Sequence, residues 1–389
     1  MRVLHVVASS QRRGAETFAA DLIRSLEREG TSQSVVLLRP GPGEIDFGVP
    51  TRSIDPVSVA GRTRRVPGIR IDRSVATVLR RAVHAEDPDV VQAHGGEALK
   101  HAVASDLRTK TPVVYRRIGM APLWIRRGAR RRAHGWLVRQ AASVIAVSES
   151  VRTESVALFG LETDRVITIP NAVDPDRIKP ARGRRALRKS LGVEAGEAIV
   201  LSLGSLGWEK DPLAHLEATS RALSAGARIV HLFAGDGPMR TALETEVERR
   251  GLSGTVRLLG VRHDVGDLLA AGDLLLFASR ADGMEGMPAQ VIEAGMAGLP
   301  VVGYATAGVP EVVVNGTTGI LVAQGDVDAL ARGIVRVSSD GPTRRAMGAA
   351  ARARCARYDI DTIAPQYLEV YRSVATARPA ARVGSKELS

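Results

Sequence analysis

One stretch of the chain constrains the fold more than any other, because it contains a buried strand, a loop, a helix and a second buried strand in that order. Residues 274–278 form an uninterrupted apolar run, which is typical of a strand covered on both faces of a parallel sheet. Pro288 suits the start of a helix, since its φ is fixed and no amide donor is needed there. We expect this helix to end near Gly298 and the second strand to span residues 301–304. The pattern predicts an α/β protein with a parallel sheet.

The loop before this helix predicts a site for an anion and for hydroxyl groups. The backbone amides of Met287, Ala289 and Gln290 lie at the helix start, where they lack helical acceptors and the helix dipole favours negative charge. Glu285 and Glu293 would repel a bound anion, so they should face a neutral group that donates hydrogen bonds. A hydroxyl of a ribose or a hexose fits. Taken alone, the two carboxylates could also be a loop charge and a solvated helix residue.

Several motifs in this region together carry a resemblance to a known family. They are, in chain order, Glu285-Gly286-Met287-Pro288 with Glu293, Gly-Val-Pro-Glu-Val at 308–312, and Asn-Gly-x-x-Gly at 315–319. This order resembles the donor-site signature of glycosyltransferase family 4, whose members are retaining transferases. The resemblance covers most of the chain and implies the GT-B fold, in which two doubly wound Rossmann-like domains face a central cleft. It also implies that Glu285, with the loop at 286–288, holds the donor sugar and that Glu293 holds the ribose hydroxyls.

The length and residue usage of the chain fit this organisation. With 389 residues the chain is too long for one ordinary core and suits two domains. It contains 44% apolar and 25% charged residues, as soluble globular proteins do, and no apolar run approaches the ~18–20 residues that span a bilayer. The single cysteine, Cys355, excludes an intrachain disulfide and a cysteine-built zinc site. Residues 1–10 fit a first strand better than a signal peptide, so we expect a cytoplasmic protein, with peripheral attachment to the inner face of the membrane as an option.

Alternating apolar runs and helical patterns predict two α/β halves. The expected strands are 3–7, 35–38, 90–93, 113–115, 144–147 and 166–169 in the first half, and 199–203, 229–234, 256–259 and 274–278 in the second. Residues 41–68 are predicted to be a loop with a short strand at 51–54. We divide the chain into an acceptor-side domain at 1–172, a nucleotide-sugar-binding domain at 173–358, a helix at 359–375 that crosses back to the first domain, and a disordered tail at 376–389.

The resemblance assigns two residues of the first domain to the site. Gly14 begins a Gly-Ala-Glu element similar to one whose glycine lets the backbone approach donor and acceptor, although Arg13 replaces a preceding glycine of the family. A tight turn is the ordinary alternative. His94 follows an apolar strand after which the family places a histidine near the transferred sugar, and a structural histidine is the alternative. A strong general base is not expected, because in a front-face retaining reaction the leaving phosphate can accept the proton.

The resemblance also assigns the phosphate and nucleotide contacts. Lys210 lies where the family has a lysine that neutralises the departing diphosphate. Ser205 stands where the family usually has an arginine, so one of the two usual cations is missing. Gly235 is expected to border the nucleotide, and Val261 with Arg262 follows a strand at which the family holds the base through backbone groups. The resemblance implies no metal, and the Asp-x-Asp pairs of this chain read as turns and helix starts.

The interval 107–148 contains no acidic side chain, which predicts an anionic partner. Its basic residues are Arg108, Lys110, Arg116, Arg117, Arg126, Arg127, Arg130, Arg131, Arg132 and Arg139. Because Trp124 and Trp136 lie among these arginines, residues 126–139 could bind an anionic membrane surface, and a solvated helix is the alternative. The aromatic content of 3% and the lack of a recognised motif argue against nucleic acid as a partner.

We therefore predict a retaining glycosyltransferase that moves a sugar from a nucleoside-diphosphate sugar to a lipid, saccharide or small-molecule acceptor. Glu285, His94 and Lys210 are the expected catalytic residues, and no cofactor is expected. One alternative is another activity of the GT-B fold, such as a phosphorylase or a nucleotide-sugar epimerase. The other is a non-catalytic module that binds sugar nucleotides or membranes, which the serine at position 205 favours.

Overall fold

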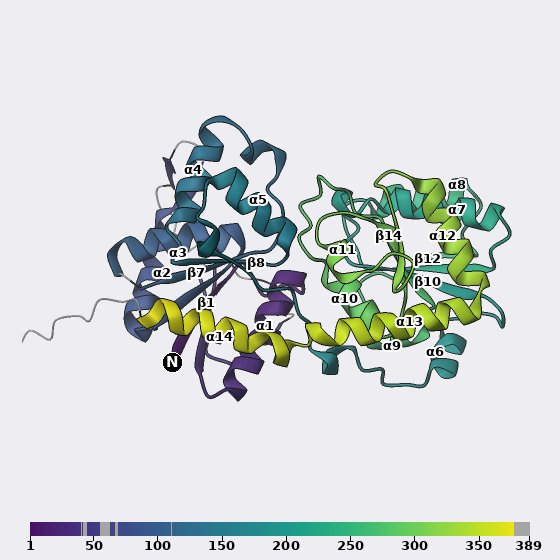
Figure 1. Ribbon diagram of the computed structural model, residues 1–389, viewed down its shortest axis with the longest axis horizontal. Helices are drawn as coiled ribbons and strands as arrows, with labels where there is room; N and C mark the ends of the chain where they lie inside the picture. The colour runs from purple at the N-terminus through teal and green to yellow at the C-terminus, as the bar shows by residue number, and fades with distance from the viewer. Residues whose placement is uncertain (40, 42–44, 55–62, 67–68, 110, 377–389) are drawn as a thin grey trace, which may run out of the picture.

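The computed structural model describes residues 1–39, 41, 45–54, 63–66, 69–109 and 111–376. Within these residues, a seven-stranded and a six-stranded parallel sheet form two α/β halves that lie side by side (Figure 1). A separate two-stranded hairpin, β4 (Thr63–Val66) with β5 (Ile69–Asp72), belongs to the first half. The predicted fold class is confirmed.

The first sheet is built outward from its centre in two directions. Its strands, in spatial order, are β3 (Thr51–Ser53), β2 (Ser32–Leu37), β1 (Arg2–Val7), β6 (Val90–His94), β7 (Val113–Arg117), β8 (Ser143–Ala146) and β9 (Val166–Thr168). All neighbours run parallel, so the carboxyl ends of the strands share one edge. The chain fills one side from β1 and the other from β6. The gap between these two strands is therefore a topological switch point, where open α/β sheets bind ligands.

The second sheet has the same plan, with its switch point between β10 and β13. Its strands, in spatial order, are β12 (Val256–Leu258), β11 (Ile229–Ala234), β10 (Ala198–Leu203), β13 (Leu274–Phe277), β14 (Val301–Tyr304) and β15 (Gly319–Val322). These strands are also all parallel. The expected strands of both halves are thus present, with small shifts at their ends.

Helices cover both faces of each sheet, as strands this apolar require. In the first half, α1 (Gly14–Arg28) and α14 (Ile360–Thr376) share one core with the sheet, and α2 (Arg73–Glu86), α3 (Gly95–Thr109), α4 (Gly128–Arg139) and α5 (Glu149–Phe159) cover the other face. In the second half, α7 (Pro212–Ser224) and α12 (Val327–Ser339) lie on one face, and α9 (Val265–Ala271) and α10 (Ala289–Met296) lie on the other. The remaining helices are α6 (Arg184–Ser190), α8 (Arg240–Arg249), α11 (Val309–Val312) and α13 (Gly341–Cys355).

The chain crosses between the halves twice, and the two crossings are hydrogen-bonded to each other. The amide of Val173 donates to the carbonyl of Tyr358 at 3.0 Å, and the amide of Ile360 donates to the carbonyl of Val173 at 3.1 Å. Beyond the second crossing, α14 runs back along α1 (Figure 1), and Tyr371 Oη donates to Gln92 Oε1 at 2.9 Å in the buried core. These crossings lie next to residues 172 and 358, and the division of the chain into an acceptor-side and a nucleotide-sugar-binding domain stays a prediction.

Two local predictions need correction, and a third falls on residues that the structure does not describe. Residues 63–66 were predicted to be loop but form β4; its strand pairing is purely local, and the polar sequence gave no burial pattern to reveal it. The run Gly-Asp-Gly-Pro at 235–238 predicts a helix that opens at Pro238, whereas α8 begins two residues later, at Arg240. Residues 377–389, the larger part of the predicted disordered tail, lie outside the described residues.

Only some of the basic side chains in the interval 107–148 are exposed on the surface. Arg116 and Arg117 end β7 and are only 1% and 3% exposed. Arg116 Nη2 donates to Asn171 Oδ1 at 2.8 Å, and Arg117 pairs with the buried carboxylate of Glu154. The prediction that these two arginines carry surface charge was wrong, because Glu154, which pairs with Arg117, lies outside the interval 107–148. Arg127, Arg130, Arg131 and Arg132 are exposed, whereas Lys110 and the side chain of Arg108 lie outside the described part.

Candidate active site

The carboxyl edges of the two sheets meet at the interface between the halves, and the predicted site residues lie along these edges. Gly14 follows β1 and His94 ends β6, so both flank the first switch point. Lys210 follows β10 and Glu285 follows β13, so both flank the second. Across the interface, the amide of Met120 donates to the carbonyl of Met284 at 3.2 Å. The topology therefore gathers residues from four separate segments at one place.

Lys210 and Glu285 form an ion pair at the second switch point. Lys210 Nζ bonds Glu285 Oε1, and only 19% and 17% of the two side chains are exposed. Gly204 lies beside them, because a Cβ at that position would be 4.0 Å from Lys210 Cε and 3.8 Å from Gln290 Nε2. The pair keeps an ammonium group beside the start of α10, with its charge balanced by a carboxylate that can also accept hydrogen bonds from hydroxyls.

The start of α10 has the features of an anion site. Pro288 is its N-cap residue, so the helix begins one position later than predicted. The amides of Ala289 and Gln290 belong to the first turn and have no acceptor among the described residues. Met287 is buried, and its carbonyl accepts a hydrogen bond from Asn171 Nδ2 at 3.1 Å. These free amides add to the positive charge of Lys210.

Glycines hold the loop of Glu285 against both halves. A Cβ on Gly119 would lie 2.0 Å from the carbonyl oxygen of Met284, and one on Gly286 would lie 2.4 Å from that of Ile118. On the other side, the amide of Gly308 donates to the carbonyl of Gly286 at 2.7 Å. Met284 itself has a φ of 65°, a strained value for a residue with a side chain. Any bulk in this contact would push the loop away from the first half.

A second contact between the halves is made by Glu311 of the Gly-Val-Pro-Glu-Val motif. Its carboxylate accepts hydrogen bonds from the amides of Glu149 and Ser150 at 3.0 and 3.2 Å. These amides begin α5, so a side chain of the second half completes the N-terminus of a helix in the first. Ser150 Oγ also donates to the carbonyl of Ala307 at 3.2 Å.

Glu293 lies inside the interface, but it is not free. It is 8% exposed, and its Oε1 accepts a hydrogen bond from Arg177 Nη1 at 2.8 Å. Arg177 also bonds the buried carboxylate of Asp21 in α1 at 3.3 Å. Arg177 thus joins one carboxylate from each half. Glu293 Oε2 has no partner among the described residues, and the predicted contact to ribose hydroxyls stays a prediction.

Three glycines make a ledge without side chains along the carboxyl ends of β10, β11 and β12. Gly235 is so close to Gly204 that a Cβ on it would lie 1.7 Å from the carbonyl oxygen of Gly204, and its amide donates to the carbonyl of Gly260 at 2.7 Å. Val261 beyond the ledge is 59% exposed, and Arg262 is engaged by Asp264 at 2.8 and 2.6 Å. The backbone, rather than the Arg262 guanidinium, is therefore available to a nucleotide here.

Ser205, at the position that usually holds an arginine, is exposed and donates a hydrogen bond to Glu209 Oε1 at 3.4 Å. It supplies no charge to the site. In the first half, Gly14 begins α1, and no atom lies within 4 Å of the position that its Cβ would take. Glu16, in the first turn of the same helix, is buried, and desolvation raises the pKa of its carboxyl group.

His94 is buried and bonded to a second buried histidine. Its Nε2 lies 3.0 Å from Nδ1 of His5, and the two rings are stacked. Burial lowers the pKa of His94 well below its ordinary value, and the nearby His5 and Arg116 lower it further. His94 is therefore neutral at pH 7 and is unsuited to act as a cationic acid.

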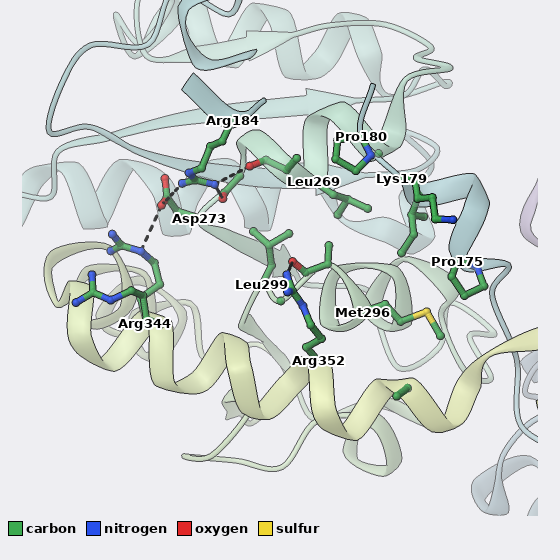
Figure 2. Close-up of a pocket in the computed structure, with 18 of the residues that line it drawn as sticks. Pro175, Lys179, Pro180, Arg184, Leu269, Asp273, Met296, Leu299, Arg344 and Arg352 are labelled. Atoms are coloured by element: carbon green, nitrogen blue, oxygen red, sulfur yellow. Dashed lines mark hydrogen bonds and ion pairs between the residues drawn. The ribbon is translucent and has the colours of Figure 1, made fainter. Parts of the chain in front are cut away.

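A cavity of about 800 Å³ lies at the opposite, amino-terminal edge of the second sheet. Figure 2 shows Arg184 and Arg344 converging on Asp273, the residue before β13, at 2.7 and 3.3 Å. Leu299, just before β14, and Arg352 line the same cavity. The cavity lies at the amino ends of the strands, whereas the candidate site lies at their carboxyl ends. The two are therefore separate.

The structure adds residues that the sequence analysis did not select. Asn171, Arg177 and Gly119 all touch the loop, the helix or the carboxylates described above. Asn171 and Arg177 lie in a Pro- and Asp-rich segment that could be recognised only as a break between domains. Nothing in the sequence around Gly119 indicated a role, because that role depends on its contact with Met284 in the other half.

No helix within the described ranges is long and apolar enough to cross a membrane. On α4 and the short turn before it, Leu123, Trp124 and Trp136 are exposed by 69%, 54% and 43%. They lie among the exposed arginines of the same segment.

Profiles of known protein families match both halves of the chain. The profile described as "Glycosyltransferase Family 4" matches residues 12–177, and that described as "Glycosyl transferases group 1" matches residues 183–354. A 2-deoxystreptamine glucosyltransferase of Streptomyces kanamyceticus is 31% identical over 210 residues, which are 53% of each chain. An N-acetyl-alpha-D-glucosaminyl L-malate synthase of Bacillus anthracis is 28% identical over 239 residues, which are 61% of each chain. The chain thus spans between half and two thirds of the length of these relatives.

Among solved structures, Anabaena HepE in complex with UDP-glucose is similar over 96% of this chain and 100% of its own, with a TM-score of 0.82 and 23% identity. Likeness at this identity concerns the fold alone. It confirms the predicted arrangement of two doubly wound domains.

Proposed function

Because the chain belongs to glycosyltransferase family 4, we propose that it transfers a sugar from a UDP-sugar to an acceptor hydroxyl with retention of the anomeric configuration. The observation that carries the proposal is the Lys210–Glu285 pair beside the free amides of α10. UDP is chosen as the nucleotide because HepE, which has the same fold, is described in complex with UDP-glucose. A glucosyltransferase and an N-acetylglucosaminyl-transferring synthase among the relatives favour a hexosyl donor.

The diphosphate would lie between Lys210 Nζ and the amides of Ala289 and Gln290. As the bond between sugar and phosphate breaks, negative charge grows on the leaving oxygen, and a fixed ammonium group with helix amides stabilises it. Donor binding would exchange partners within the ion pair: the ammonium turns to phosphate, and the Glu285 carboxylate accepts hydrogen bonds from sugar hydroxyls. The glycine ledge at 204, 235 and 260 would take the nucleoside, because it has no side chains to exclude it.

The proton of the acceptor hydroxyl would pass to the leaving phosphate oxygen on the same face of the sugar. This route needs no protein base, in keeping with a His94 that is neutral and buried. The acceptor would approach from the first half, near Gly14 and His94. The contacts at Gly119 and Glu311 would bring the two halves together around the donor and exclude water.

The proposal is tested by thermal shift with UDP, GDP and ADP, followed by turnover of the matching nucleotide sugars. We expect UDP to raise Tm most, since a ligand at about 100 times its Kd stabilises the native state by ~2.7 kcal/mol. Glu293→Ala should remove most of the UDP shift, measured against its own ligand-free Tm. Glu248→Ala, at an exposed position of α8, is the matched control and should keep the shift. Equal shifts with all three nucleotides, or release of sugar 1-phosphate only in the presence of phosphate, would contradict the proposal.

A membrane surface is a second proposed partner, and the exposed aromatic and basic residues of 123–139 support it. Such a segment would bind anionic headgroups through arginines and insert its tryptophans at the interface. Sedimentation with anionic vesicles should exceed that with neutral vesicles, weaken with salt, and fall in Trp124→Ala combined with Arg130→Glu. Equal sedimentation with both vesicles would dismiss this partner.

A further inference from the structure

The cavity at the amino-terminal edge of the second sheet has the size and the chemistry of a small-molecule site (Figure 2). Its volume of about 800 Å³ falls within the roughly 300–1,000 Å³ of ligand pockets. Ile178, Leu269 and Leu299 give it an apolar floor and are at most 8% exposed. The cationic side chains of its lining are Lys179, Arg184, Arg344, Arg345 and Arg352. The same lining holds two carboxylates, those of Asp273 and Asp359, so positive charge is in excess.

Only some of these cations are occupied by the protein itself. Arg184 and Arg344 converge on Asp273 at 2.7 and 3.3 Å, so their role is structural. Arg345 is exposed, and its side chain has no hydrogen-bond or ion-pair partner among the described residues. Arg352 donates to the C-cap carbonyl of α10 at 2.8 Å and has no carboxylate partner there. Two guanidinium groups are thus left at the cavity, and such groups bind carboxylate, phosphate or sulfonate oxygens well.

The cavity touches both crossings between the halves. Pro175 of the first crossing and Asp359 of the second line it, and both lie within two residues of the hydrogen bonds that join the crossings. The next part of the first crossing is fixed to the second half, because the amide of Ala181 donates to Asp267 Oδ1 of α9 at 2.7 Å. A molecule in the cavity would therefore contact the second half and the connection to the first half at the same time.

Two elements connect this cavity with the candidate site. Helix α10 is about 12 Å long, at 1.5 Å for each of its eight residues. Its start lies at the ion pair of the candidate site, and its last residue, Met296, lines the cavity. The short 3₁₀ helix η4 (Pro175–Ile178) lines the cavity with its first and last residues. Its third residue, Arg177, does not line the cavity and bonds Glu293 and Asp21 instead, so both elements lead from the cavity to Glu293.

We propose that the cavity is a regulatory site for a small molecule that carries an anionic group on an apolar body, and that its occupancy strengthens donor binding. The apolar floor takes the body of the molecule, and Arg345 with Arg352 takes its anionic group. A molecule that contacts both crossings favours the arrangement in which the halves touch and Arg177 holds Glu293. The donor is proposed to bind in this same arrangement, so each ligand strengthens the binding of the other. The effect on donor binding rests on the proposed function, whereas occupancy of the cavity does not.

Occupancy is tested by fluorescence titration of the full chain with two probes. Anilinonaphthalene sulfonate is an amphipathic anion that fluoresces in apolar surroundings, and N-phenylnaphthylamine has the same rings without the sulfonate. The sulfonate should bind saturably and at least about tenfold more tightly than the neutral amine, because a charge-assisted hydrogen bond is lost in the amine. Arg345→Glu should weaken sulfonate binding by about tenfold or more for the same reason. Arg81→Glu, at an exposed position of α2, is the matched control and should leave it unchanged.

The coupling is measured by calorimetric titration of UDP with and without saturating anilinonaphthalene sulfonate. The Kd of UDP should fall by roughly fivefold or more, and UDP should tighten sulfonate binding by the same factor. Arg177→Gln should keep sulfonate binding but lose most of this factor, which a merely structural cavity would not produce. Displacement of the sulfonate by UDP, an unchanged Kd of UDP, or unchanged sulfonate binding in a folded Arg345→Glu protein would overturn the proposal. Absence of UDP binding, with sulfonate binding that depends on Arg345, would support the cavity as a site and count against the proposed function.

Discussion

Replacing Gly119 by alanine isolates the contact between the halves from the stability of each half. The added Cβ would meet the carbonyl oxygen of Met284 at 2.0 Å, its carbon at 3.2 Å and the amide nitrogen of Gly286 at 3.7 Å. All three atoms belong to the other half, so neither core is crowded. To reach an ordinary contact, the loop before Glu285 must move by more than an ångström and lose its hydrogen bond to Met120.

This movement displaces Glu285 and Lys210 from the opposite sheet edge while leaving donor contacts within the second half intact. Overpacking of this kind costs about 1–3 kcal/mol, which corresponds to a roughly 5- to 150-fold loss in kcat/KM. The assay is donor turnover, with Tm measured in parallel. Gly254→Ala is the control, because no atom lies within 4 Å of its Cβ position. If Gly119→Ala keeps kcat/KM within twofold of the wild type, or loses Tm in proportion to activity, the role assigned to this contact is wrong.

Three further predictions follow from the same geometry. Lys210→Met should lower kcat by about 10²-fold or more, because it removes the cation facing the leaving phosphate. A rise in KM with kcat unchanged would instead show that Lys210 acts in binding only. Glu311→Ala should weaken the contact with α5 and increase the radius of gyration in X-ray scattering, whereas an unchanged radius would mean that the contact does not hold the halves together. Stability should be constant above pH 6.5 and fall as pH drops toward 4, because burial lowers the pKa of His5 to about 4 and the unfolded chain then binds more protons. The free energy of unfolding in urea should change by up to ~1.4 kcal/mol per pH unit through this residue, and His5→Gln should reduce the total slope, to which other buried histidines also contribute. An equal slope in the variant would contradict the assignment.

Much of the fold could be predicted from the sequence, because buried parallel strands are continuous apolar runs. The run at 229–234 matches β11 in full, and the run at 301–304 matches β14 in full. Pro288 marked the start of α10 to within one residue. The hairpin at β4 and β5 was missed, since its strands pair only with each other and are only four residues long. A strand this short offers too few positions for an alternating pattern to be recognised.

Only part of the candidate site could likewise be predicted from the sequence. Lys210 could be selected through the resemblance to the family, and Glu285 through its place in a loop between an apolar strand and the start of a helix. Their pairing could not be predicted, because it depends on two loops that are far apart in the sequence. Arg177 could not be identified as the partner of Glu293 for the same reason.

The central claim is that the donor diphosphate binds where the switch point of the second sheet faces the first. A crystal structure of the protein soaked with UDP tests it most directly. We expect the β-phosphate in hydrogen-bond contact with Lys210 Nζ and with the amides of Ala289 or Gln290, and the uridine along the glycine ledge. Nucleotide density in the arginine-lined cavity beside Asp273, with none at Lys210, would contradict the account.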